Sequence, residues 1–189
     1  MGLSKRFHSS RTLTYAVTAL ECLFMKRRRV LTFAATAAVW PGAMALPAKP
    51  LLRISGRVGR VNNNILNSYE FSEAAFMQLA MASIATSTPW SPMSVFTGPL
   101  LQTVMREAGV TAGTLNCKTL DDYSAPIPWE DLARFEVILA HSQNGQRLSE
   151  KRWGPLWTIY PRDTYPEALS GPIAESRFIW QINRIDVSA

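Results

Sequence analysis

Few side chains of this sequence have the reactivity that catalysis or metal binding requires. After residue 49 the chain holds one cysteine, Cys117, and one histidine, His141. The thiol is either buried as a small hydrophobic group or available for chemistry. A lone histidine excludes a metal site built from several imidazoles, and a Ser-His-Asp triad would depend on it alone. The adjacent carboxylates of Asp121 and Asp122 either take a cation or form a turn.

Tryptophan side chains are frequent in the same part of the chain. An apolar aromatic wall with an arginine at its rim is the usual composition of a small-molecule site. Arg152 or Arg162 can supply that charge. Part of the tryptophan set is therefore expected to line a ligand pocket, and its members are Trp90, Trp129, Trp153, Trp157 and Trp180.

The elements expected to position these residues include several strands. Alternating apolar and polar residues, or short apolar runs, predict them. The segment 61–71, with three consecutive asparagines, is expected to be a hairpin tip or loop, and Asn144-Gly145 a tight turn. The predicted strands and extended segments are residues 51–58, 114–120, 123–128, 136–142, 148–161 and 176–187.

Three helices are expected between them. Ser72 can cap a helix over 73–84, residues 98–110 form an amphipathic helix that Gly109 ends, and 129–135 form a shorter one. Strands scattered among a few short helices, without a regular βαβ rhythm, indicate an α+β domain with a mixed sheet. The expected apolar face of the second helix consists of Leu101, Val104, Met105 and Ala108.

The N-terminal part reads as an export signal. Residues 25–45 combine a basic start, an apolar run and small residues before a cleavage point after Ala45, which is typical of a secretory leader. The run is too short to span a bilayer and Pro41 interrupts it. Arg27-Arg28 fits either a twin-arginine signal or an ordinary basic start. Residues 1–24 are then an upstream extension or a mis-assigned start, and 46–189 form a single domain.

The charge of the chain is concentrated in this N-terminal part. The first 49 residues carry a net charge of +7 and the other 140 carry −1, which together give the +6 of the whole chain. A nucleic-acid partner would need a basic face on the folded part, so we expect none. The protein is expected to be periplasmic or secreted, without a stable membrane span once the leader is removed.

Residues 123–161, YSAPIPWEDLARFEVILAHSQNGQRLSEKRWGPLWTIYP, resemble the oxidoreductase molybdopterin-binding domain of the sulfite oxidase superfamily. The features shared with that family are a strand that ends in Ile-Pro, a Val-Ile-Leu-Ala strand, an Asn-Gly turn and a Gly-Pro-aliphatic strand that ends in Pro. The order of motifs extends the resemblance to 51–187. It implies the α+β fold of that family and a molybdenum cofactor held by its pterin.

The resemblance also implies which residue occupies the position of the molybdenum ligand. In the family a cysteine thiolate ligates molybdenum, and aligning Trp90 with the Trp of the family motif places Thr86 at that position. A neutral hydroxyl is a poor substitute for a soft thiolate. The resemblance therefore describes a small exported member without the usual ligand, in which binding of the molybdenum cofactor is doubtful. Cys117 is either a relocated ligand or a buried structural thiol.

Other matching positions point the same way. The family run His-Gly-Phe-Pro-aliphatic-Arg, which helps to hold the pterin, corresponds to RWGPLW, so Arg152 replaces the His and Trp157 the Arg. A guanidinium can still pair with a phosphate, whereas an indole cannot. Trp180 stands at the lysine of the final family strand. The pterin-binding segment that precedes the first family strand has no room after the leader.

Tyr123 matches the tyrosine that faces substrate and metal in sulfite oxidases. Its phenol can donate a hydrogen bond to an oxyanion or assist a proton transfer. The alternative is an aromatic residue of a half-buried strand.

Two functions follow from these expectations. The first is a molybdopterin-dependent oxidoreductase that acts on a small oxyanion or sulfoxide, with Tyr123 and an arginine orienting the substrate. The second is a non-catalytic module of the same fold that binds a small ligand or a periplasmic redox or sensor partner. The hydroxyl of Thr86 and the indole of Trp157 favour the second.

Overall fold

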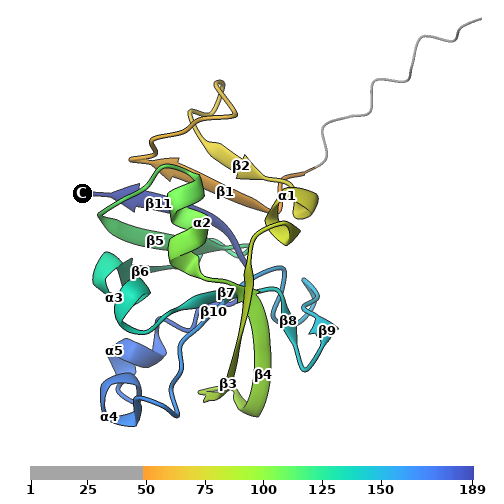
Figure 1. Ribbon diagram of the computed structural model, residues 1–189, viewed down its shortest axis with the longest axis vertical. Helices are drawn as coiled ribbons and strands as arrows, with labels where there is room; N and C mark the ends of the chain where they lie inside the picture. The colour runs from red at the N-terminus through yellow and green to blue at the C-terminus, as the bar shows by residue number, and fades with distance from the viewer. Residues whose placement is uncertain (1–48) are drawn as a thin grey trace, which may run out of the picture. The chain divides into compact units, whose positions relative to one another are not determined.

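The structure, a computed structural model, describes residues 49–189. A mixed five-stranded sheet forms one side of this part of the chain (Figure 1). The predicted extension 1–24 and the predicted leader 25–45 lie outside the described residues. The strand order is β2-β1-β11-β5-β6, and only β1 and β11 are parallel. The strands are β1 (Leu52–Gly56), β2 (Tyr69–Phe71), β5 (Thr114–Thr119), β6 (Ser124–Pro128) and β11 (Ile182–Ser188).

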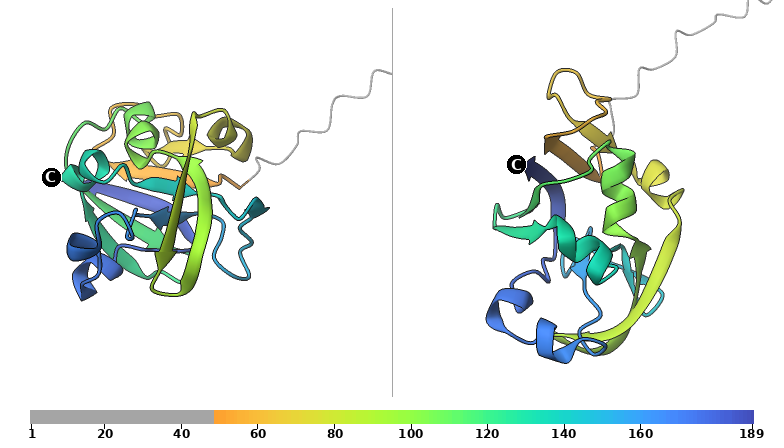
Figure 2. Two further views of the ribbon diagram at one scale, coloured as in Figure 1. Left: turned by 60° about the horizontal axis from the view of Figure 1, so that its bottom comes forward. Right: turned by 60° about the vertical axis from the view of Figure 1, so that its left-hand side comes forward.

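A long hairpin, β3–β4, extends away from this sheet (Figures 1 and 2). It belongs to a four-stranded sheet of order β3-β4-β8-β9, while β7 and β10 form a separate pair. These strands are β3 (Met81–Thr88), β4 (Ser91–Pro99), β7 (Ile138–Ala140), β8 (Ser142–Gln143), β9 (Gln146–Arg147) and β10 (Trp157–Ile159).

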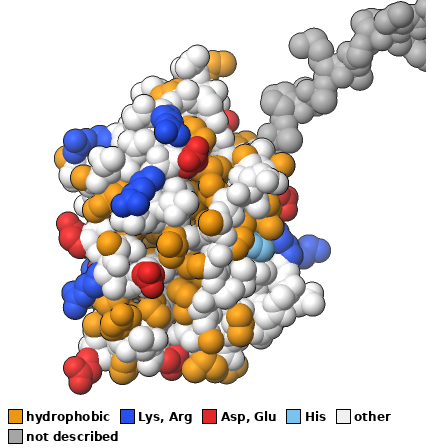
Figure 3. Space-filling view, viewed as in Figure 1, with side chains coloured by type: hydrophobic (Ala, Val, Ile, Leu, Met, Phe, Trp, Pro, Cys, Tyr) orange, Lys and Arg blue, Asp and Glu red, His pale blue; other side chains and the backbone are white. Residues whose placement is uncertain are grey.

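Five short helices of the described chain complete an α+β fold with mixed sheets, as the sequence predicts. None of the helices between residues 49 and 189 has the length and apolar character needed to cross a membrane. Basic and acidic side chains are interspersed among apolar ones on the face in Figure 3. The helices are α1 (Glu73–Met77), α2 (Leu101–Glu107), α3 (Trp129–Arg134), α4 (Pro166–Leu169) and α5 (Pro172–Glu175).

Helix α2 is the best predicted element. Its expected apolar face is fully buried in the core, and Gly109, at φ +74°, ends the helix as expected. A Cβ atom at Gly109 would lie 2.8 Å from the Cα of Gly59, so glycine also permits the close approach of these two loops. The face consists of Leu101, Val104, Met105 and Ala108.

The predicted helix over 73–84 is wrong beyond its first turns. Ser72 caps it as expected, accepting a hydrogen bond of 3.1 Å from the amide of Ala75, but α1 ends at Met77. Strand β3 begins at Met81 and pairs with β4 along its whole length. This hairpin pairing with the next strand outweighs the helix preference of Ala, Leu and Met, because propensity differences are small.

The start of the predicted helix over 98–110 is also wrong, because Gly98 and Pro99 complete β4. The Asn144-Gly145 turn is confirmed, with both residues at positive φ. The extended segments predicted over 148–161 and 176–187 are too long, since only β10 and β11 are strands. Helices α4 and α5 were not predicted, although a proline at the first helical position of each is a usable signal.

Gly98 allows β4 to lie directly against β7, because an added Cβ atom would meet the carbonyl oxygen of Leu139 at 2.1 Å. Gly98→Ala is therefore expected to lower the free energy of unfolding by about 2–4 kcal/mol, the range of severe overpacking. Gly171→Ala is the matched control, since nothing lies within 4 Å of its Cβ position. Its cost should stay below about 1 kcal/mol in urea titrations. Equal costs would contradict this account of the contact.

Candidate functional site

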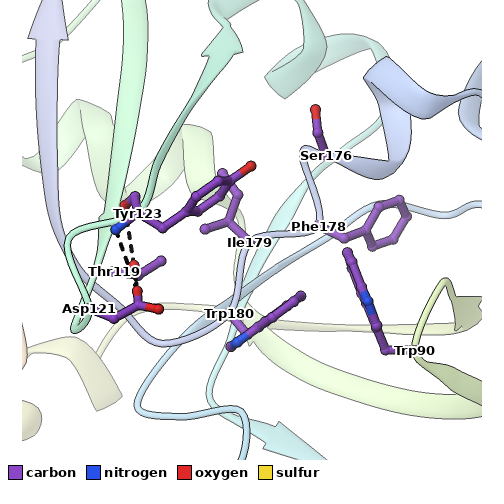
Figure 4. Close-up of a pocket in the computed structure, with 8 residues that line it drawn as sticks. All are labelled: Trp90, Thr119, Asp121, Tyr123, Ser176, Phe178, Ile179 and Trp180. Atoms are coloured by element: carbon purple, nitrogen blue, oxygen red, sulfur yellow. Dashed lines mark hydrogen bonds between the residues drawn. The ribbon is translucent and has the colours of Figure 1, made fainter.

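An open cavity of about 230 Å³ lies where the turn of the β3–β4 hairpin approaches the chain between α5 and β11 (Figure 4). The turn contributes Trp90. The end of β5 and the turn into β6 contribute three residues, and the segment 176–180 contributes four. The lining residues are Trp90, Thr119, Asp121, Tyr123, Ser176, Phe178, Ile179 and Trp180.

The hairpin turn holds Trp90 in place although 43% of this residue is exposed. The hydroxyl oxygen of Thr88 accepts hydrogen bonds from the amides of Trp90 at 3.2 Å and Ser91 at 2.9 Å. Thr88 thereby closes the turn in the manner of short polar side chains. The indole of Trp90 then packs edge-on against Trp180, with ring centroids 4.4 Å apart.

Four tryptophans form a continuous row from this cavity into the core. Trp180 contacts Trp153 at 5.4 Å between ring centroids, and Trp153 stacks on Trp157 at 4.9 Å. Trp157 is fully buried and its Nε1 donates to the carbonyl of Phe178 at 3.3 Å. Of the tryptophans expected at a ligand pocket, Trp90, Trp153 and Trp180 line cavities, the buried Trp157 does not, and Trp129 lies apart on α3.

A second cavity of about 490 Å³ also includes Trp90 in its lining and has a different composition. Arg152 lines it, as does Arg147, which also pairs with Glu73 at 2.9 Å. Arg162 instead pairs with Glu175 at 2.8 Å and lines neither cavity. The residues around the second cavity are Trp90, Ser91, Pro92, Ser94, Gln143, Asn144, Gln146, Arg147, Leu148, Ser149, Arg152 and Trp153.

Thr86 is fully buried near the end of β3, where its hydroxyl is bound to Asp163. The hydroxyl donates to Oδ2 of Asp163 at 2.9 Å and accepts from the Asp163 amide at 3.3 Å. Ser87 donates to the same carboxylate through its amide and, at 3.1 Å, through its hydroxyl. These hydrogen bonds, led by the Ser87 amide and followed by Thr86, hold the pKa of Asp163 below its ordinary value.

The described residues offer no thiolate at either cavity. Cys117 is their one cysteine, and it lies fully buried on β5 in the core. Burial raises the pKa of its thiol to about 12, so the thiol is protonated at neutral pH. His141 is buried with its Nδ1 unpaired among the described residues, and burial lowers its pKa. Between residues 49 and 189, no three His, Cys, Asp or Glu side chains are grouped as metal ligands.

Tyr123 and Asp121 stand together at one end of the first cavity (Figure 4). Tyr123 is 52% exposed and lies just before β6, in the turn that follows β5 rather than in a strand. Oδ1 of Asp121 accepts hydrogen bonds from the Thr119 hydroxyl and, at 3.4 Å, from the Tyr123 amide. These bonds, that of Thr119 first, lower the pKa of Asp121. The neighbouring Asp122 pairs with Arg184 outside the cavity.

The sequence did not indicate the part of this site that follows α5. Ser176, Phe178 and Ile179 lie in a segment that was expected to be strand, and no motif distinguishes them. A weak signal was available, because an aromatic residue, an aliphatic residue and Trp180 follow one another directly.

A family model described as oxidoreductase molybdopterin binding domain matches residues 69–164. The chain belongs to this family. The match contains β3, β4, Tyr123 and β6, and it ends just after Asp163. The molybdopterin-binding fold predicted from the sequence motifs is thereby confirmed.

A solved structure of the same fold is the sulfane dehydrogenase SoxCD from Paracoccus pantotrophus. It is 15% identical to this chain with a TM-score of 0.53, and the match covers 77% of this chain. At that identity the likeness shows the fold alone. The matched part is 40% of the SoxCD chain, so this protein corresponds to less than half of it. No curated protein matches the sequence.

The family implies a molybdenum cofactor, and the side chains present do not fit a metal ligated by a protein thiolate. The hydroxyl of Thr86 is engaged with a carboxylate, and the thiol of Cys117 is protonated and enclosed by the core. Of the residues matched to the family's pterin contacts, Arg152 alone is positively charged, and it lines the second cavity.

The hydrogen bonds of Asp163 predict a pH-dependent stability. Because its pKa is lowered in the folded protein, the ionised carboxylate stabilises the fold at neutral pH, and this contribution is lost as the pH falls through the folded pKa. The decrease in the free energy of unfolding caused by Asp163→Asn should be constant above about pH 5 and become smaller below about pH 4. Urea titrations across this range measure it.

Glu167→Gln is the control for this titration, since Glu167 is an exposed carboxylate on the neighbouring helix α4. It should change stability little throughout the range. A loss in Asp163→Asn that does not depend on pH would contradict the assignment of the stabilisation to the ionised Asp163.

Proposed function

We propose that this chain is a non-catalytic member of the molybdopterin-binding family that holds no molybdenum and binds a small molecule in the first cavity. The observation that carries the proposal is the environment of Thr86. This residue stands at the position of the family's cysteine, and its hydroxyl is already bound to Asp163. A neutral hydroxyl in that arrangement is a poor ligand for molybdenum.

The neighbourhood of Thr86 supports the proposal. The carboxylate of Asp163 has a lowered pKa and is ionised at neutral pH, and it is hydrogen-bonded to Thr86, the residue matched to the family's cysteine, so its charge would repel the oxygens of an oxidised metal centre bound there. Exchanging Thr86 for a ligand would also remove a donor from Asp163. The site is therefore organised around the carboxylate.

The tryptophan row supports it independently. Trp157 and Trp180 stand at family positions that carry an arginine and a lysine. Both indoles pack against Trp153, and Trp157 lies wholly in the core. An indole cannot neutralise a pterin phosphate, whereas a cation can. Of the three positions Arg152, Trp157 and Trp180, which are matched to the family's pterin contacts, Arg152 alone carries a cation, and it lines the second cavity.

An oxidoreductase is the second candidate, and the exposure of Tyr123 favours it. The phenol lines the first cavity, where it could donate a hydrogen bond to an oxyanion or sulfoxide substrate. If a molybdenum cofactor were bound, it would supply the oxygen and electron transfer. Arg152 would then pair with the cofactor phosphate from the second cavity.

Elemental analysis separates the two functions. The full chain, produced in a host that makes the molybdenum cofactor, is expected to contain less than about a tenth of an equivalent of molybdenum and to show no pterin fluorescence, because Thr86 supplies no thiolate. A sulfite oxidase-family protein with its cysteine, prepared in parallel, controls for cofactor supply. Stoichiometric molybdenum would overturn the binding-module proposal.

The variant Thr86→Cys tests which feature excludes the metal. We expect it to remain free of molybdenum, because Asp163 and the two indoles are unchanged. A stoichiometric gain of metal would show instead that the missing thiolate alone excludes the cofactor and that Trp157 and Trp180 leave room for the pterin.

We also propose that the protein is exported and acts in the periplasm or outside the cell, with a redox or sensor protein as its partner. The composition of residues 25–45 supports this. N-terminal sequencing of the protein recovered from the periplasmic fraction is expected to begin after Ala45. A chain that begins at Met1 or Met25 in exported protein would contradict cleavage.

A further inference from the structure

We propose that the ligand of the first cavity is a small organic cation that carries a quaternary or otherwise methylated ammonium group. This inference rests on the proposed function, because it requires that no molybdenum cofactor fills the site. It goes further by naming the charge and shape of the bound group. The two cavities beside Trp90 differ in the charge that they favour, and this difference supports the assignment.

The walls of the cavity are mainly aromatic. Rings from three separate segments lie around the space in Figure 4; those of Trp90, Tyr123 and Trp180 keep accessible surface, whereas Phe178 and Ile179 are buried. The faces of such rings carry negative electrostatic potential and attract a cation within about 6 Å, with tryptophan the strongest of them. The rings are those of Trp90, Tyr123, Phe178 and Trp180.

The single charged side chain that lines the cavity is Asp121. Its carboxylate is fixed through Oδ1 by Thr119 and the Tyr123 amide, while Oδ2 receives no hydrogen bond from the described residues. None of the ion pairs formed within residues 49–189 involves Asp121, whereas Asp122 beside it is paired with Arg184. The cavity therefore offers an anionic group with no counter-charge of its own.

The second cavity shows the opposite preference. Arg147 and Arg152 line it, and no carboxylate does. An anionic ligand would be attracted there and repelled from the first cavity by Asp121. Trp90 belongs to the lining of both cavities, which therefore adjoin the same residue.

The balance of polar groups favours a methylated ammonium over a primary one. A primary ammonium must replace three hydrogen bonds to water. The side-chain acceptors on the lining are the Asp121 carboxylate and three hydroxyls, two of which, those of Thr119 and Ser176, are already engaged with Asp121 and the Ile173 carbonyl. A methylated ammonium needs fewer hydrogen-bond acceptors or none, and contact between its charge and the aromatic rings stabilises the complex. The modest volume of about 230 Å³ suits a compact head group.

The aromatic walls are held in place before a ligand arrives. Trp180 is wedged between Trp90 and Trp153, and Phe178 is buried against Tyr160 with ring centroids 5.5 Å apart. Thr88 fixes the backbone at Trp90. Walls that are already ordered lose little entropy on binding, which raises the affinity for a small ligand.

Calorimetric titration with choline tests the inference on the purified full chain. The comparison probe is the neutral alcohol in which a carbon atom replaces the choline nitrogen, so the two probes share their shape and differ in charge. Choline is expected to bind at least about tenfold more tightly than this alcohol, because the rings and Asp121 act on the charge. Tryptophan fluorescence should change in parallel, since Trp90 and Trp180 line the cavity.

Two pairs of variants locate the binding. Asp121→Asn should weaken the affinity for choline at least about fivefold and leave the affinity for the neutral alcohol unchanged. Asp122→Asn should change neither affinity, because the carboxylate of Asp122 pairs with Arg184. Trp90→Ala should weaken choline about tenfold. Tyr165→Ala is its control, because Tyr165 is also 43% exposed and lies outside both cavities.

The outcomes distinguish this inference from the proposed function. Equal affinity for choline and the neutral alcohol would overturn the proposal of a cationic ligand. The protein would then be a binding module for neutral molecules. If the protein is folded, as its circular dichroism spectrum shows, and binds neither probe, the inference is also overturned. The result of the molybdenum analysis does not depend on this outcome. Stoichiometric molybdenum would instead overturn the proposed function itself.

Discussion

The carboxylate of Asp163 organises the end of the hairpin from which the site is built. It joins β3 to a segment 77 positions further along the chain through the hydroxyl of Thr86 and both donors of Ser87. Three donors on one carboxylate fix its position, since hydrogen bonds to a charged group are the stronger ones. The direction in which β3 leaves this contact determines where the β3–β4 turn, and with it Trp90, is placed.

The aromatic row depends on that placement. Trp90 reaches Trp180 only because the turn approaches the segment before β11, and Trp180 in turn packs on Trp153. Each ring supports the next until Trp157 joins the buried core. An exposed tryptophan at the surface is thus connected by direct packing to residues that cannot move without disturbing the fold.

The sequence predicted those features whose signals are local. The buried face of α2, the Asn144-Gly145 turn and the strand that contains Cys117 follow from short patterns of residue type, and the structure confirms them. The boundary between α1 and β3 could not be predicted in this way, because Met81 and the residues after it are extended through pairing with β4. Non-local pairing overrides a weak helix preference.

The site was predictable to a similar extent. Trp90 and Tyr123 were identified because they stand in motifs, and both line the first cavity. The role of Asp163 was not foreseen, since nothing near it in the sequence indicates a partner on β3. Phe178 was missed for a related reason, because its segment is irregular and takes its position from contacts with distant residues.

Two neighbouring cavities of one fold differ in the charge of the side chains that line them. The hairpin, β5 and β11 supply the backbone, and the chemistry of each cavity follows from the residues at the ends of these elements. Asp121 gives one cavity a negative group, and Arg152 gives the other a positive one. Trp90 belongs to the lining of both cavities, so a substitution at this one position is expected to change the surface of each.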